Sequence, residues 1–268
     1  MQSSIGSGLG TIRAGMTSQY AVLGSPIAHS KSPLLHSAAF ALAGIQASYS
    51  AIELERGLGG FVSNLDSSWQ GLSLTMPLKE EALDVASQLH PLAISTRAAN
   101  TLIRVESSWL GYNTDVMGLQ MAASDISFQT VGILGTGATA RSAAVAFEEN
   151  EITVWGRNSD KAAGICEAYG GKLGSLEQVL SRDLVISALP AGVLIGLLEE
   201  AQTGTLLDVV YTNNEVGGYF PAQISGLEML LWQAIGQQRL FQTGQLEMPL
   251  EDEPSLLAAM RSSLVVGE

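Results

Sequence analysis

Short apolar segments alternate with helix-forming segments in two successive series along the chain of 268 residues. The first series predicts strands at 20–24, 47–54, 71–76 and 101–105 and helices near 33–44 and 78–89. The second series predicts strands at 130–135, 151–156, 183–189 and 205–211 and helices near 138–149, 159–169 and 192–202. Strands that alternate with helices are typical of parallel sheets with helices on both faces. We therefore expect an α/β protein with two domains.

The boundaries of these domains are predicted from the break between the two series, which falls near 115–130. A leader at 1–15 has no apolar periodicity and is expected to be flexible. A first domain with a mostly parallel sheet is expected at 16–115, and a second domain at 116–226. Residues 227–268 read as helical and are expected to pack on the first domain.

Composition limits the classes of partner. The chain carries 26 acidic and 13 Lys or Arg residues, a net charge of −13, which argues against nucleic acid or an anionic membrane as partner. A single cysteine, Cys166, excludes an intramolecular disulfide and suits a reducing cytoplasm. Neither a long apolar stretch nor a secretory signal is recognised. We expect a cytoplasmic protein, monomeric or homodimeric, with a small-molecule ligand.

Two serines stand one residue apart in the segment GSPIAHSKSP at 24–33. Ser32 before Pro33 is a good helix start, with serine as N-cap and proline at the first helical position. That interpretation leaves Ser30 without a role. Alternatively, the two hydroxyls bind a small anion beside the N–H groups of a helix start. The loop alone leaves both interpretations open.

A glycine-rich loop follows the predicted strand at 130–135, in the segment VGILGTGATAR. Gly135, Gly137 and Ala140 have the spacing of the dinucleotide-binding fingerprint, and Ala138 lies between them. The first glycine permits the turn, the second admits the pyrophosphate, and the small third residue lets helix and strand pack closely. A turn without a ligand is the alternative interpretation. The flanking strand and helix favour a nucleotide site.

The end of the next predicted strand indicates which nucleotide is bound. An NAD enzyme places an acidic residue there to bind the ribose hydroxyl. This chain instead has Gly156 followed by Arg157, Asn158 and, one turn later, Lys161. A guanidinium and an ammonium suit the 2′-phosphate of NADP. A solvated basic pair at a helix start is the alternative.

Several separated motifs, taken in order, resemble the shikimate dehydrogenase family. They are GSPIAHSKSP, LTMPLKEEA, AANTL, NTD, GTGATAR and SGLEMLLWQA, and the resemblance runs from about Tyr20 to Met248. The segments GLSLTMP and SGLEMLL are most similar to the actinobacterial branch. The resemblance implies a Rossmann domain at 116–226 and a substrate-binding and catalytic domain at 16–115. It also implies NADPH-dependent, reversible reduction of 3-dehydroshikimate to shikimate in the biosynthesis of chorismate and the aromatic amino acids.

The family's functional residues can be matched one by one. Lys79 and Asp115 match its catalytic pair, and Ser30 and Ser32 match the hydroxyls that hold the substrate carboxylate. The remaining substrate-binding matches are Thr75, Asn100, Tyr211 and Gln233. The chemistry agrees with the match, because an ammonium can stabilise the oxygen of a ketone that receives hydride and deliver its proton. No metal is required.

Two departures from the family pattern stand out. Ser73 occupies a position where many relatives have asparagine, and the segment 212–225 is shorter than expected by about two helical turns. The shortened segment 212–225 is expected to affect cofactor affinity and domain closure more than the chemical step. An NAD-dependent quinate or shikimate dehydrogenase and a non-catalytic sensor of a shikimate-like acid therefore stay as alternatives.

Overall fold

The computed structural model describes residues 17–211, 216 and 218–266. The predicted leader at 1–15 and part of the shortened segment 212–225 lie outside the described residues. The chain forms two compact units. Unit 1 comprises Met1–Thr114 and Ala234–Glu268, and unit 2 comprises Asp115–Gln233. Each unit is described by itself.

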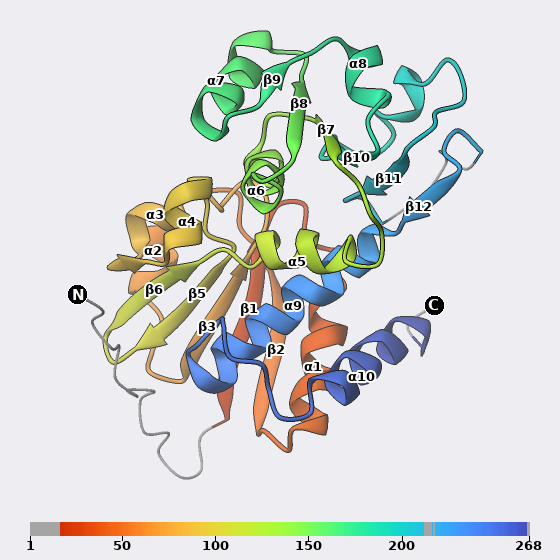
Figure 1. Ribbon diagram of the computed structural model, residues 1–268. Coiled ribbons are helices and arrows are strands. Elements are labelled where there is room, and N and C mark those ends of the chain that lie inside the picture. Colours follow the sequence, from red (N-terminus) through yellow and green to blue (C-terminus); the bar gives the residue numbers. More distant parts are fainter. Residues whose placement is uncertain (1–16, 212–215, 217, 267–268) are drawn as a thin grey trace. The chain divides into compact units, whose positions relative to one another are not determined.

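Unit 1 contains a six-stranded sheet with the order β2-β1-β3-β5-β6-β4 (Figure 1). The strands are β1 (Ser18–Gly24), β2 (Ala47–Glu53), β3 (Trp69–Leu74), β4 (Gln88–Leu89), β5 (Thr101–Val105) and β6 (Ser108–Tyr112). Parallel pairs join β1 to β2, β1 to β3 and β4 to β6, whereas β5 runs antiparallel to β3 and β6. The sheet is therefore mostly parallel, as predicted. The β5–β6 pair is antiparallel because only Glu106 and Ser107 connect it.

Helices cover both faces of this sheet. They are α1 (Ser32–Leu42), α2 (Leu58–Ser63), α3 (Ala82–Val85), α4 (Pro91–Thr96), α10 (Glu253–Val266) and, from Ala234 onward, α9 (Gly226–Thr243), whose first residues belong to unit 2. Alternate residues of a strand point to opposite faces. Leu23 and Leu72 accordingly join the apolar cluster beneath α2, whereas Tyr20 packs on the rings of Phe40 in α1 and Phe241 in α9.

The helix predicted at 78–89 is wrong in extent. The structure has turns up to Glu81, then the four-residue helix α3 and the short strand β4. The Lys79 carbonyl accepts the N–H of Ala99 at 2.8 Å, while the N–H of Leu83 bonds to Glu80. The turn is thus hydrogen-bonded to the segment before β5 and does not continue as a helix.

Unit 2 contains six strands, all parallel, in the order β12-β11-β10-β7-β8-β9 (Figure 1). The strands are β7 (Thr130–Leu134), β8 (Glu151–Trp155), β9 (Lys172–Leu173), β10 (Leu184–Ser187), β11 (Thr205–Asp208) and β12 (Ala222–Ile224). The helices are α5 (Asp115–Ala122), α6 (Ala138–Ala146), α7 (Ser159–Tyr169), α8 (Leu176–Leu180) and the 3₁₀ turn η1 (Ile195–Leu197). This is the doubly wound arrangement that the alternating sequence pattern predicts.

The helix predicted at 192–202 is also wrong, because only η1 forms there. Gly192 has a φ of +74°, a left-handed conformation that an α-helix cannot include. Leu194 and Leu198 are nevertheless buried, in the cluster beneath α8. The apolar residues that suggested a helix are therefore buried by a loop.

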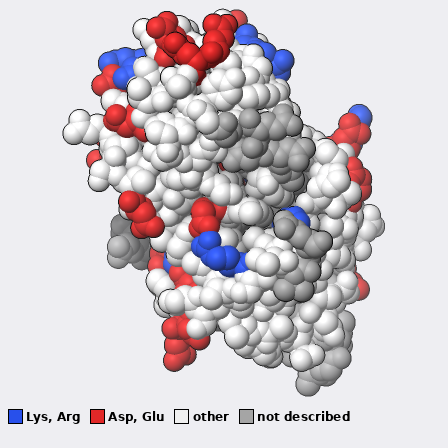
Figure 2. Space-filling model, turned by 90° about the vertical axis from the view of Figure 1, so that its right-hand side faces the viewer, with Lys and Arg blue, Asp and Glu red and all other residues white. Residues whose placement is uncertain are grey.

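Acidic side chains are spread widely over the face drawn in Figure 2, with basic side chains in small groups. Among the described residues, no helix is both long and apolar enough to cross a membrane.

Candidate active site

The loops after β1 and β3 approach each other closely, and Gly24 makes this possible. A Cβ atom at Gly24 would overlap the side chain of Thr75. The N–H of Ser25 donates to the carbonyl of Met76 at 2.9 Å, and the N–H of Thr75 donates to the carbonyl of Leu23 at 2.9 Å. Ser30 and Ser32 follow β1 and Thr75 follows β3, so the candidates lie on two loops that are hydrogen-bonded to each other.

The start of α1 differs from the expected N-cap. Lys31 occupies the N-cap position and its side chain makes no capping bond. Instead the Ser30 hydroxyl accepts the backbone N–H of Ser32 at 3.3 Å. The prediction that Ser32 caps the helix is wrong, because Ser32 lies one residue inside it. Its side chain is buried.

Asn100 and Thr114 meet at the same edge of the sheet. The Asn100 amide donates to the Thr114 hydroxyl at 2.9 Å, and its oxygen accepts the Thr114 N–H at 2.9 Å. The Thr101 hydroxyl donates to the same oxygen at 2.9 Å. Asp115 follows Thr114 directly, begins α5 and is 3% exposed.

The unit 1 candidates thus gather at one edge, where β1, β3 and β6 end and β5 begins. Ser30 and Ser32 follow β1, and Thr75 and the partly buried Lys79 follow β3. The Asn100 carbonyl accepts the N–H of Leu74 at 2.7 Å, which places it beside the end of β3. The edge offers hydroxyl, amide and ammonium groups, which suit a polyhydroxylated acid.

Polar side chains beneath this edge form a buried network that the sequence did not predict. The Nε2 atom of His36 bonds to Oε1 of Gln237 at 3.0 Å, and its Nδ1 atom bonds to the amide of Gln238 at 2.8 Å. The Gln237 amide donates onward to the Thr101 hydroxyl at 3.0 Å. Both ring nitrogens of His36 have partners that suit a neutral imidazole protonated at Nε2.

The buried His36 makes stability depend on pH. Burial lowers the pKa of His36 to about 3, from the 6.5 of an exposed histidine. Above pH 6.5 both folded and unfolded chains hold it neutral. As pH falls from 6.5 towards 3, only the unfolded chain binds the proton, so the free energy of unfolding falls by up to about 1.4 kcal/mol per pH unit.

We expect His36→Asn to flatten this slope in denaturant titrations between pH 6 and pH 4. The exposed His29 provides the control, because His29→Asn should leave the slope unchanged. An equally steep slope in His36→Asn would assign the acid sensitivity to other groups.

Unit 2 carries the glycine-rich loop between β7 and α6. Gly135 has a φ of +121°, and a Cβ there would lie 2.9 Å from the carbonyl oxygen of Ala188. Gly137 precedes α6, which begins at Ala138, and a Cβ at Gly137 would meet nothing within 4 Å. Ala140 is fully buried. The loop therefore has the turn, the open approach and the close helix packing that a pyrophosphate site requires.

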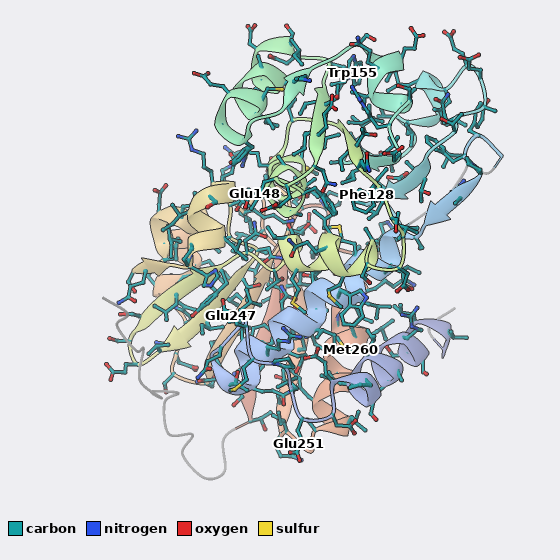
Figure 3. The ribbon with its side chains drawn as sticks, viewed as in Figure 1. Phe128, Glu148, Trp155, Glu247, Glu251 and Met260 are labelled. Carbon is teal, nitrogen blue, oxygen red and sulfur yellow. The ribbon has the colours of Figure 1, made fainter. Side chains whose placement is uncertain are left out.

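The segment after β8 is exposed. Trp155 ends the strand (Figure 3), and Arg157 and Lys161 project from the segment that follows. The Asn158 side chain accepts the N–H of Lys161 at 2.9 Å and caps α7. Asn158 therefore has a structural role at the helix start. Arg157 and Lys161 are the cations available to a phosphate.

The two remaining predicted residues also belong to unit 2. Tyr211 is partly buried and follows β11. Gln233 is buried in α9, and its amide donates to the carbonyl of Leu230 at 2.9 Å. At the end of β11, burial raises the pKa of Asp208.

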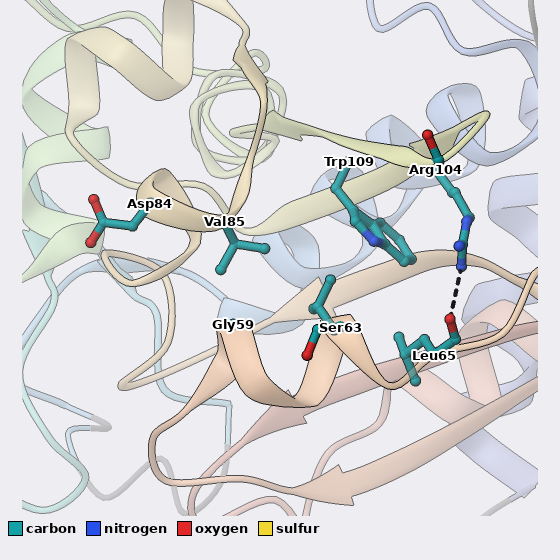
Figure 4. A pocket seen from close by; sticks show the side chains of 9 residues that line it. Gly59, Ser63, Leu65, Asp84, Val85, Arg104 and Trp109 are labelled. Atoms are coloured by element: carbon teal, nitrogen blue, oxygen red, sulfur yellow. Dashed lines mark hydrogen bonds between the residues drawn. The ribbon is translucent and has the colours of Figure 1, made fainter.

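A pocket of about 330 Å³ in unit 1 lies away from these residues, beneath α2 (Figure 4). Its guanidinium, from Arg104, lies 5.4 Å from the ring centre of Trp109 and donates to the carbonyls of Leu65 and Asp66. None of the predicted site residues lines this pocket. The guanidinium of Arg104 in this pocket is therefore already hydrogen-bonded within unit 1.

Comparison with known proteins decides the family. The model of the shikimate dehydrogenase substrate-binding domain matches residues 22–102. A shikimate dehydrogenase (NADP(+)) from Thermus thermophilus is 32% identical, with 86% of this chain and 94% of that protein aligned. The chain belongs to the shikimate dehydrogenase family.

Solved structures of the family agree. Shikimate dehydrogenase from Mycobacterium tuberculosis is 33% identical, with a TM-score of 0.80 over 94% of this chain and 100% of that chain. The Thermus thermophilus enzyme in complex with NADP(H) and shikimate is 30% identical, with a TM-score of 0.79 over 92% and 100%. The expected two-domain α/β fold of the family is thereby confirmed.

Proposed function

We infer that this chain is an NADP-dependent shikimate dehydrogenase that interconverts 3-dehydroshikimate and shikimate in aromatic amino-acid biosynthesis. The observation that carries this inference is the set of hydroxyl, amide and ammonium groups at one edge of unit 1. It accompanies a glycine loop of nucleotide-binding geometry in unit 2. The family membership supports the same reaction, because the related enzymes carry that name.

The substrate is held by neutral groups, which avoids burying unpaired charge. Ser30 and Ser32 bind the carboxylate. Thr75, Asn100 and Gln233 bind the ring hydroxyls, and Tyr211 lies near the carboxylate and the nicotinamide.

Lys79 supplies the proton. Bound NADPH would supply the hydride that the carbonyl carbon of the substrate accepts. The Lys79 ammonium donates a hydrogen bond to the carbonyl oxygen, stabilises the negative charge that develops there, and protonates it. The Asp115 carboxylate orients the ammonium and favours its charged form.

The glycine loop and the two exposed cations fit the cofactor. The open space at Gly137 and the first turn of α6, with Ala138 and the buried Ala140, would hold the pyrophosphate. Arg157 and Lys161 would hold the 2′-phosphate, whereas Asn158 keeps the helix start in place.

Two finer features belong to this proposal. The enzyme works in the cytoplasm, where Cys166 stays reduced; burial raises the pKa of its thiol and makes it less reactive. It acts as a monomer or homodimer without nucleic acid or membrane partners, consistent with its charge of −13.

The test is oxidation of NADPH by the purified protein in the presence of 3-dehydroshikimate. We expect turnover with NADPH, and much slower turnover with NADH at equal concentration. Turnover with quinate and NAD instead would favour the NAD-dependent alternative. Tight binding of shikimate without any turnover would favour a sensor.

The two serines are expected to differ. Ser30→Ala removes the acceptor of the Ser32 N–H and should lower the free energy of unfolding by about 0.5–1 kcal/mol. Ser32→Ala removes no cap, so its main effect should be a KM for 3-dehydroshikimate raised about fivefold to tenfold. Steady-state kinetics and denaturant unfolding measure the two effects. An unchanged KM in both variants would contradict carboxylate binding by these serines.

A further inference from the structure

The side-chain amide of Asn100, a proposed substrate-binding group, lies in an orientation that its neighbours fix. Its Oδ1 atom accepts the backbone N–H of Thr114 at 2.9 Å and the Thr101 hydroxyl at 2.9 Å. A backbone N–H can only donate, so the atom that faces it must be the amide oxygen. The amide nitrogen therefore faces the Thr114 hydroxyl, to which it donates at 2.9 Å.

Gln237, in the part of α9 that belongs to unit 1, determines where the Thr101 proton goes. Its Nε2 atom donates to the Thr101 hydroxyl at 3.0 Å and to the backbone carbonyl of Asn100 at 3.3 Å. A backbone carbonyl can only accept, so the Gln237 amide also has a single orientation. Because Gln237 presents a donor to Thr101, it does not compete for the one hydroxyl proton, which Thr101 donates to Asn100.

The other end of the Gln237 amide is held by His36. The Oε1 atom of Gln237 accepts from Nε2 of the imidazole at 3.0 Å, and Nδ1 of the same ring accepts from the Gln238 amide at 2.8 Å. The Gln238 oxygen accepts in turn from the Gln242 amide at 2.9 Å. Every bond in this series donates in the direction of Asn100, and hydrogen bonds aligned in this way strengthen one another.

Burial makes these bonds hard to replace. Asn100, Thr101 and Gln237 are each at most 1% exposed, so water does not substitute for a partner that is removed. The direction of donation is therefore set by the side chains themselves. A side chain held in this way before a ligand arrives loses little further conformational freedom on binding.

We propose that Thr101 and Gln237 are positioning residues for substrate binding, which hold the Asn100 amide in the orientation that meets a ring hydroxyl of the substrate. This role rests on the proposed function, in which Asn100 binds a ring hydroxyl. Neither Thr101 nor Gln237 touches the substrate in this assignment. Both act through Asn100, and Gln237 acts through Thr101.

The first experiment compares Thr101→Val with Thr101→Ser. Valine keeps the branched shape but lacks the hydroxyl, so we expect KM for 3-dehydroshikimate to rise about threefold to tenfold, while kcat and KM for NADPH stay within about twofold. Thr101→Ser retains the hydroxyl and should restore KM to within about twofold of the parent value. An equal rise in both variants would overturn the proposal, because the hydroxyl would then not be the group that matters.

A double variant tests whether Thr101 acts through Asn100. Asn100→Ala alone should raise KM for 3-dehydroshikimate, and Thr101→Val in that background should raise it further by less than about twofold. A full additional increase would overturn the proposal, because Thr101 would then act independently of Asn100. An unchanged KM in Asn100→Ala would also overturn it, because Asn100 would then not bind the substrate.

Ser68→Ala controls for the loss of a buried hydroxyl from the same unit. Ser68 lies just before β3, at the opposite end of that strand from the candidate residues, and its hydroxyl accepts the Gln19 amide at 2.8 Å. Its removal should lower the free energy of unfolding and leave KM unchanged. A raised KM in Ser68→Ala would overturn the proposal, because any weakening of the sheet would then raise KM.

Gln237→Met replaces Thr101→Val if the valine variant does not fold. It removes the donor to Thr101 at similar volume, and KM for 3-dehydroshikimate should rise about twofold to fivefold. An unchanged KM in Gln237→Met would overturn the proposal. Absence of turnover by the parent enzyme would contradict the proposed function, whereas normal parental turnover with an unchanged KM in Thr101→Val contradicts only the positioning role.

Discussion

Replacing Lys79 with alanine is expected to lower kcat by about 10²–10⁴-fold, the usual range for loss of a positioned acid. The reason is the charge that hydride transfer leaves on the carbonyl oxygen. Without the ammonium, that charge loses the cationic donor and the proton source of the proposed site. Stopped-flow and steady-state measurements with NADPH and 3-dehydroshikimate would give kcat and KM separately.

Folding should survive this substitution. Lys79 is only partly buried, and its backbone carbonyl, which accepts the Ala99 N–H, is retained in alanine. Lys172→Ala, which removes an exposed lysine of unit 2, is the control for loss of one positive charge. Near-normal kcat in Lys79→Ala would remove Lys79 from the mechanism, and a low kcat in Lys172→Ala would make the loss non-specific.

The eight strands predicted from sequence all formed, although β4, β6, β9 and β12 were not predicted, whereas two of the predicted helices did not form as expected. A buried strand such as 151–156 is a short apolar run with few alternatives, and β8 occupies Glu151–Trp155. The runs at 78–89 and 192–202 have helix-like residues, but tertiary contacts decide their conformation. In the first segment the Lys79 carbonyl accepts the N–H of Ala99, and in the second the N–H of Gln202 donates to the Tyr219 carbonyl. Both partners, Ala99 and Tyr219, lie outside the predicted helices, so the pattern within those ranges does not reveal them.

The candidate site shows the same division. Ser30, Ser32 and Lys79 were selected as candidates because polar residues in loops after strands stand out from the apolar pattern, and their roles stay predictions. The buried, stacked pair Tyr49 and His36 did not stand out, because a tyrosine in a strand and a histidine in a helix are both common. Their pairing depends on which helix packs on which strand, and that information is not local in the sequence. Two adjacent buried glutamines, Gln237 and Gln238, within α9 were the available signal.

Arg157→Ala is expected to weaken NADPH by about 10- to 100-fold while leaving NADH nearly unchanged. A charge-assisted bond from a guanidinium to the 2′-phosphate is worth about 1.5–3 kcal/mol, and NADH lacks that phosphate. Arg157 is exposed and lies beyond the end of β8, so its removal should not disturb the sheet. Titration with each cofactor would measure both affinities. Arg56→Ala, an exposed arginine of unit 1, is the control.

Reversal of the preference needs an acid, and the structure decides where to place it. Gly156 is nearest the strand end, but a Cβ there would lie 2.5 Å from the Thr136 side chain in the glycine loop, so an aspartate at Gly156 would disturb the pyrophosphate site. Arg157→Asp avoids this contact, repels the 2′-phosphate and offers the ribose an acceptor. We therefore expect Arg157→Asp to favour NADH more strongly than Arg157→Ala does.

High salt should reduce the preference of the parent enzyme for NADPH over NADH, because salt screens the exposed cation. Equal use of NADH and NADPH by the parent enzyme would leave Arg157 as a solvated charge at the start of α7.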